Sequence, residues 1–215
     1  RDLHSFPTRR SSDLATTLTI IDTPTLNGTE LDKGTRPSPP APSYQASYQA
    51  YDATNNLAYN VGTVVVSNTI ADAGDIHNQL FLNDGYYGNG SSWIDSLIEV
   101  PNTKSWVKID LGSSYSLSDV MFGRDRLGHF DDRDPGQFII QVAAMDAVFS
   151  NGDISGDDTE YTTIFNSSTA TPVFSGLIDG NDTIQAGFDA IDARFLKITF
   201  DLNNAAIDEI EIHGS

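Results

Sequence analysis

Apolar and polar residues alternate in many short segments of this chain, which is the pattern of β-strands with one buried face. In WVKIDLG, at residues 106–112, the side chains of Val107, Ile109 and Leu111 fall on the same face. Gly, Asn, Asp and Ser separate such segments, and a Ser/Tyr turn is expected at residues 113–116. The predicted strands are residues 15–22, 61–70, 106–112, 117–123, 137–143, 161–165, 171–176, 194–200 and 206–212.

The last of these strands carries both apolar and acidic residues. Its alternation directs Ile210 and Ile212 inward, with Glu209 and Glu211 on the opposite face. No segment of the chain shows an amphipathic helix with capping residues. The fold is therefore predicted to be all-β, an antiparallel β-sandwich of the jelly-roll type.

The N-terminal part of the chain has a different character. SFPTRRSSDL resembles the translation of a common sequencing-library adapter, so residues 1–14 are interpreted as an artefact of an environmental or draft assembly. Four prolines in residues 34–43 are typical of a linker, or of a long loop. We therefore expect a linker or remnant of a preceding segment at residues 15–59, and a folded domain at residues 60–215.

Composition narrows the class of partner. The 215 residues carry a formal net charge of -18 and have a pI of about 4.2, so the surface repels phosphate backbones and nucleic acid is not an expected partner. The acidity suits a secreted protein or calcium-binding carboxylates, and equally plain solubility. No cysteine is present, which excludes disulfides and thiolate chemistry. No apolar run has the length of a transmembrane segment.

Several motifs follow one another in a recognisable order. A DG-containing loop precedes a tryptophan, and then come WVKIDLG, VMFGRDRLG, GQFIIQVA, ARFLKITF and IDEIEIHG. This succession, over residues 60–214, resembles the discoidin family, also called the coagulation factor V/VIII type C domain family, which has the galactose-binding-like fold. The resemblance implies that Trp106 is a core residue, that Arg194 supports the fold, and that the closing strand lies beside the first one.

The resemblance also implies a function. Members of that family are binding modules for sugars, lipid head groups or proteins, and they are attached to enzymes or surface proteins without being catalytic themselves. The expected protein is thus a non-catalytic module of a longer secreted or surface protein, with a glycan as the favoured partner. An adhesion or spacer domain that contacts protein is the alternative, and a polysaccharide-acting jelly-roll enzyme is the second.

The segment LNDGYYGNGSSWI, at residues 82–94, is rich in Gly, Asn and Ser and is expected to be irregular. In sugar-binding relatives such a loop holds one structural calcium ion, which takes six to eight oxygen ligands. The ligands that the resemblance implies here are carbonyls near Leu82 and Asn89, the carboxylates of Asp84 and Glu209, and the hydroxyl of Ser91 or Ser92. The alternative is a loop held by its own hydrogen bonds.

Cationic side chains gather in GRDRLGHFDDRDPG, at residues 123–136, although the protein is acidic. Arginine presents a planar fork of donors that suits sugar hydroxyls, and an aromatic ring stacks on the apolar face of a pyranose. The candidate sugar site therefore comprises Arg124, Arg126, His129 and Arg133, with stacking by Tyr86 or Tyr87, or by Phe130. The alternative is that Arg–Asp pairs hold this loop together.

The remaining motifs indicate little chemistry. NGDISGDDTE, at residues 151–160, matches a calcium loop only in part, and an acidic hairpin insertion is the favoured interpretation. No GxSxG, HExxH or phosphate-binding glycine loop is present. His213 is expected at the surface, and His77 is expected near the loop at residues 82–94.

Overall fold

The computed structural model describes much of the chain from residue 16 to the C-terminus. The described residues are 16–21, 25–26, 29–30, 48–49, 55–59, 62–67, 69, 77–87, 92–95, 104–123, 133, 135–149, 152–156, 158–170, 183–202 and 205–215. The strand predicted at residues 171–176 lies outside these ranges.

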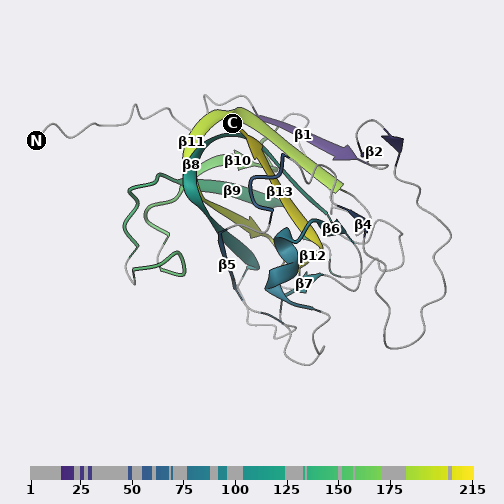
Figure 1. The fold of residues 1–215 in the computed structure, drawn as a ribbon, viewed down its shortest axis with the longest axis horizontal. Coiled ribbons are helices and arrows are strands. Elements are labelled where there is room, and N and C mark those ends of the chain that lie inside the picture. The colour runs from purple at the N-terminus through teal and green to yellow at the C-terminus, as the bar shows by residue number, and fades with distance from the viewer. Residues whose placement is uncertain are drawn as a thin grey trace, which may run out of the picture.

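Nearly all regular structure in the described residues is β-strand (Figure 1). The longer strands are β1 (Thr16–Ile21), β5 (Thr63–Val66), β8 (Trp106–Gly123), β9 (Phe138–Ala143), β10 (Thr162–Asn166), β11 (Thr183–Phe200) and β13 (Glu209–Gly214). Two-residue strands are β2 (Thr25–Leu26), β3 (Thr29–Glu30), β4 (Tyr48–Gln49), β6 (Tyr86–Tyr87), β7 (Trp93–Ile94) and β12 (Ala206–Ile207), and η3 (Gln79–Asn83) is a short 3-10 helix.

Two long strands, β8 and β11, organise the molecule. They pair antiparallel from the Thr183–Gly123 contact at one end to the Thr199–Trp106 contact at the other. The first half of β8 also pairs with β5, and the second half of β11 pairs with β9, which in turn pairs with β10. The opposite halves pair with β13 and β1.

The paired long strands bend together near their middle, so that their halves belong to two facing layers (Figure 1). The register shifts around this bend, between Gly187 and Ile191 and between Ala193 and Phe195. Gly112 adopts a φ of 76° there, a conformation that glycine tolerates best. The Ser/Tyr turn predicted at residues 113–116 is therefore wrong, because these residues lie within one continuous strand, and Tyr115 and Ser116 pair with β11.

The core lies between the two layers, and the predicted all-β jelly-roll sandwich is confirmed. Phe122, at the end of β8, packs edge-on against Phe138 of β9 and Phe200 of β11, with ring centroids 4.8 and 5.4 Å apart. The two ends of each long strand therefore lie at the same end of the sandwich, here called the loop end. The predicted inward face of Val107, Ile109 and Leu111 is also buried.

The core tryptophan is Trp93 of β7, which has no exposed surface. Trp106 is only partly buried, so its predicted core position is wrong. Successive side chains of a strand point to opposite faces, so Trp106 and Lys108 lie on the same face. The ammonium of Lys108 lies 4.9 Å from the centroid of the Trp106 ring. Both side chains lie on the outer face of the sheet.

The connection between β9 and β10 covers this outer face. The ammonium of Lys108 donates to the carbonyl of Gly156 at 2.8 Å and lies 3.0 Å from Asp158, whose other oxygen is 2.6 Å from the ammonium of Lys197. Both lysines are almost fully buried. The acidic insertion predicted at residues 151–160 is thus the β9–β10 hairpin connection, and a buried pair of lysines fixes it to the sheet.

Strand β11 is longer than predicted, since residues 183–193 precede the predicted segment 194–200. In that part Ile184, Ala186 and Phe188 are buried and alternate with less buried residues. The small side chains of Ala186 and Gly187 and two nearby aspartates weaken the hydrophobic pattern that identifies a strand.

Both faces of β13 are buried, including the face of Glu209 and Glu211 opposite the two isoleucines. Glu209 and Glu211 have no exposed surface, as is also true of Ile210 and Ile212. His213 is not a surface residue either, because its Nδ1 lies 2.7 Å from Asp119 and its Nε2 lies 3.3 Å from Glu211. Because the outer face of β13 is buried too, a segment from elsewhere in the chain must cover it.

That segment comes from residues 55–59. The backbone N–H of Leu57 donates to the carbonyl of Ile212 at 2.8 Å, and the side chain of Asn56 bonds to β13. Strand β5, which follows residues 55–59 in the sequence, pairs with β8 and not with β13. Residues before the expected boundary at residue 60 thus contact the sheet, as does β1, which confirms the strand predicted at residues 15–22.

Replacing Phe122 by Ala should lower the free energy of unfolding by about 3–5 kcal/mol, because it opens a cavity between the two layers. Urea denaturation measures this loss. The control is Leu80→Ala, at a side chain that is 68% exposed and should change stability by less than about 0.5 kcal/mol. Equal effects of the two substitutions would contradict the described core.

The ion pairs of His213 should make stability depend on pH. Burial by itself lowers the pKa of His213, but the hydrogen bond to Asp119 and the nearby carboxylate of Glu211 outweigh it and raise the pKa from 6.5 to about 9. The protonated histidine therefore contributes its full stabilisation below about pH 6.5, and this is lost as the pH rises through about 9.

Comparison with His213→Gln measures that contribution. We expect the wild-type chain to exceed the variant by on the order of 2–3 kcal/mol near pH 6, and the difference to disappear above about pH 9. Urea unfolding of both proteins across this range gives the two curves. A difference independent of pH would show that the charge of His213 is not what matters.

Candidate functional site

The loop end of the sandwich brings together segments that are far apart in the sequence. Strand β7 pairs with β12, and η3 lies beside β7 and β13 (Figure 1). Strand β8 ends at Gly123, which pairs with Glu209 and whose carbonyl accepts from the N–H of Asp208 at 2.9 Å. The long loop that starts after Gly123 therefore leaves the sheet beside the first residue of β13.

The base of the loop at residues 82–94 is closed by local interactions. Asn78 caps η3 by accepting a hydrogen bond from the N–H of Leu80 at 3.0 Å, and its own N–H donates to the carbonyl of Ser92. The hydroxyl of Ser92 lies 2.9 Å from Nδ1 of His77. His77 thus lies next to this loop, as predicted. The hydroxyl of Ser92, one of two candidates for the calcium ligand, is in contact with this histidine.

The loop is less irregular than predicted. It contains the end of η3, the two-residue strand β6 and β7. Tyr86 and Tyr87, the candidate stacking residues, form β6, and their backbone pairs with Gln49 and Tyr48 of β4. The two tyrosines are therefore part of a short strand pair within this loop.

The turn at Asp84 and Gly85 requires a glycine for two reasons. Gly85 has a φ of 87°, and a Cβ at this position would lie 2.5 Å from a ring carbon of Tyr59. Asp84 is the C-cap of η3. In this turn the N–H of Gly85 faces Glu209 and donates to its Oε2 at 3.0 Å.

Glu209 is the centre of a buried hydrogen-bond network. Its Oε1 accepts from the side-chain amide of Asn56 at 3.2 Å, while Oε2 accepts from Gly85. The amide oxygen of Asn56 accepts in turn from the N–H groups of Ala58 and Ile212, at 2.9 and 3.0 Å. One side chain of β13 thus connects the DG turn with the segment at residues 55–59.

The predicted calcium ligands are only partly brought together by the described residues. Glu209 lies against the turn that carries Asp84, whereas the side chain of Leu82 is fully buried in the core and only its carbonyl is a possible ligand. Asn89 and Ser91 lie outside the described residues. Within the described ranges, no three His, Cys, Asp or Glu side chains group closely enough to bind a metal by themselves. A site here thus depends on carbonyl and hydroxyl oxygens.

One cationic candidate can be placed. Arg133 has a φ of 65° and a partly buried side chain, and its carbonyl accepts from the N–H of Ala206 in β12 at 3.3 Å. Because β12 pairs with β7, Arg133 lies at the same end as the loop of Tyr86 and Tyr87. The other candidates, Arg124, Arg126, His129 and Phe130, lie outside the described residues.

Sequence reasoning missed two polar groups of this end. Asp95 is buried and accepts from the hydroxyls of Ser67 and Ser105, at 3.0 and 2.7 Å. Asn56 binds β13 although it lies in the segment expected to be a linker. Neither contact has a local signal, since the two serines are 28 and 10 positions from Asp95, and the β13 partners of Asn56 are 153 to 156 positions away.

The resemblance made two further predictions that the structure tests. Arg194 does support the fold, because its guanidinium binds both carboxylate oxygens of Asp110 on the neighbouring strand, at 2.6 and 2.8 Å. The closing strand lies beside residues 55–59 rather than beside β5, which occupies a different stretch of the β8 edge. Among the described residues there is no helix with the length and hydropathy needed to span a lipid bilayer.

Comparisons with known proteins identify the fold. No family model and no curated protein sequence match the chain. Among solved structures, the C-terminal domain of a chitobiase from Bacteroides fragilis is similar, with a TM-score of 0.55 and 14% identity over 74% of this chain and 97% of that one. The CpGH89CBM32-5 module from Clostridium perfringens, solved with GalNAc-β-1,3-galactose, has a TM-score of 0.54 and 14% identity over 74% and 99%.

A third similar structure is the family 32 carbohydrate-binding module of NanJ from C. perfringens in complex with galactose. It has a TM-score of 0.50 and 14% identity, over 74% of this chain and 97% of that chain. At these identities the similarity establishes a shared fold. The chain therefore has the all-β sandwich fold of these structures.

Proposed function

We propose that the chain is a non-catalytic carbohydrate-binding module that holds its ligand at the loop end. What supports this proposal is the position of the described residues next to the candidate segments. Arg133 contacts β12, and β12 pairs with β7, which follows Tyr86 and Tyr87 in the sequence. Strand β8 ends beside Glu209 at Gly123, the residue before the remaining candidate cations. The shared fold with modules solved in complex with sugars supports the same assignment.

The chemistry of these residues suits a sugar. Guanidinium groups donate several directed hydrogen bonds to hydroxyls, an imidazole donates or accepts, and tyrosine rings provide apolar area against a pyranose face. Arg124, Arg126, His129 and Arg133 supply the polar contacts, and Tyr86 or Tyr87 the stacking surface. Membership of the discoidin family, secretion or surface display, and attachment to a longer protein form the finer part of the proposal.

Calcium is the second component of the proposal. Glu209 is a fully buried carboxylate whose Oε2 accepts from Gly85, so it lies against the turn that carries Asp84. A hard divalent cation prefers carboxylate and carbonyl oxygens, which are the groups that these segments offer. Asp84 and Glu209, loop carbonyls near Leu82 and Asn89, and the hydroxyl of Ser91 would hold the ion and fix the loop.

The sugar site is tested with a glycan array, using the full chain in multimeric form because single modules bind weakly. The double substitution of Arg126 and His129 by Ala should weaken binding to any glycan that is bound by about tenfold or more. Asp192→Ala, at an exposed residue of the bend, is the control and should leave binding unchanged. Undiminished binding by the double variant would move the site away from this loop, and a folded wild-type protein that binds no glycan would contradict the proposed function.

The calcium site is tested by thermal unfolding with calcium and with a chelator. Calcium at about 100 times its Kd should add about 2.7 kcal/mol to the free energy of unfolding, since it binds the folded state alone. Asp84→Asn should remove most of this increment. Asp153→Asn, in the other acidic loop, should retain it and also tests that loop as a calcium site. A melting temperature that the chelator does not change would refute bound calcium.

A further inference from the structure

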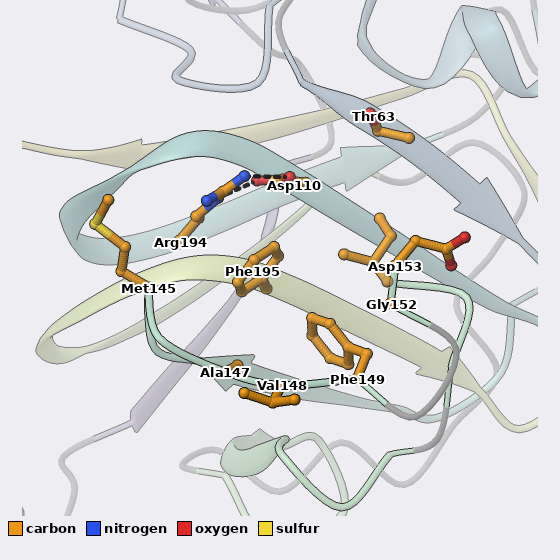
Figure 2. A pocket seen from close by; sticks show the side chains of 11 residues that line it. Thr63, Asp110, Met145, Ala147, Val148, Phe149, Gly152, Asp153, Arg194 and Phe195 are labelled. Atoms are coloured by element: carbon orange, nitrogen blue, oxygen red, sulfur yellow. Dashed lines mark hydrogen bonds and ion pairs between the residues drawn. The ribbon is translucent and has the colours of Figure 1, made fainter.

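A groove of about 380 Å³ lies on the outer face of the sheet, next to the bend of β8 and β11 (Figure 2). Its walls come from the start of β5, the middle of both long strands and the β9–β10 connection. The bend is opposite the loop end, so this groove is separate from the sugar site proposed above.

One wall of the groove is polar and rigid. The guanidinium of Arg194 binds Asp110 through Nε and Nη2, at 2.6 and 2.8 Å, and its Cζ lies 4.8 Å from the ring centroid of Phe195. These bonds use two of the five N–H donors of the side chain. The side chain of Arg194 is 28% exposed, so it presents donors to the groove in a fixed orientation. Thr63 extends the polar wall (Figure 2).

The facing wall is apolar. Phe149 packs edge-on against Phe195, with ring centroids 5.1 Å apart, and both rings line the groove (Figure 2). At its rim Val148 is 78% exposed and Met145 is 59% exposed. A concave surface that combines apolar side chains with a few placed polar groups has the general composition of a ligand site.

The lining selects a class of ligand. A sugar ring has a hydroxyl edge and an apolar C–H face, which correspond to the polar and apolar walls. An aliphatic chain leaves the guanidinium unused, and a purely polar ligand leaves Val148 and Met145 in contact with water. The ionisable lining residues are Arg194, Asp110 and Asp153, with formal charges of +1, -1 and -1 that sum to -1, so an anionic sugar is disfavoured.

We propose that this groove is a second saccharide site, which takes a neutral sugar without involving the loop end. In naming a saccharide as the occupant, the proposal rests on the function proposed above. Its position also rests on the insertion, because Phe149 and Val148 belong to the β9–β10 connection that Lys108 and Asp158 hold against the sheet. Two sites on opposite ends would let one module bridge two chains of a polysaccharide.

Amide chemical shifts of the 15N-labelled full chain test the proposal. The probes are N-acetyllactosamine, cellobiose and chitobiose, with a glucuronate-containing disaccharide as the anionic counterpart. We expect at least one neutral disaccharide to shift the amides of residues 145–149, 152–154 and 194–195, and the anionic probe to leave them unchanged. Val148→Asp should weaken this response by about tenfold while the loop-end response persists. Leu80→Asp, at an exposed side chain outside the groove, should retain both responses.

The outcomes separate the two sites. Shifts confined to the loop end would overturn the second site and leave the proposed function standing. Groove shifts that disappear when Arg126 and His129 are replaced by Ala would also overturn it, because they would then follow from binding elsewhere. Shifts from an apolar peptide but from none of the disaccharides would overturn the saccharide as occupant. No response to any sugar at either end would overturn both proposals.

Discussion

The pairing of β8 with β11 is the constraint on which the rest of the structure depends. Each strand is long enough to contribute to both layers, and the pair bends as a unit at Gly112. Once this ribbon is bent, its four half-strand edges define where β5, β13, β9 and β1 add. The bend also separates the two candidate sites, because Arg133 and β6 lie at the loop end whereas the groove lies next to the bend.

Much of the sandwich could be predicted from local patterns. Strict alternation identified Val107, Ile109 and Leu111 as a core face, and the structure buries all three. The same rule does not report the burial of Glu209 and Glu211, since a period of two shows which side chains share a face and not whether that face is covered. The cover comes from Asn56, whose contacts to β13 leave no trace in the sequence near either residue.

One candidate site could be predicted from the sequence and the other could not. The proximity of the DG turn to Glu209 was predicted by resemblance to a family, and the hydrogen bond of Gly85 agrees with it. The groove at the bend could not be predicted, because it exists only where an insertion folds back over the sheet. Two lysines that alternation assigns to the solvent face, Lys108 and Lys197, are what hold that insertion, by sharing Asp158. Arginine, lysine and aspartate in a strand pattern indicate exposure far more often than such a buried contact.

The network around Glu209 has a consequence for how the chain folds. Asn56 is bonded to residues 153 to 156 positions later, so its partners in β13 are synthesised long after it. Loop-closure entropy over such a distance slows folding, and the edge of β8 that receives β13 stays open until β13 has been made. Nascent chains therefore expose an unpaired edge next to apolar side chains, a state prone to association, and the docking of β13 ends that exposure.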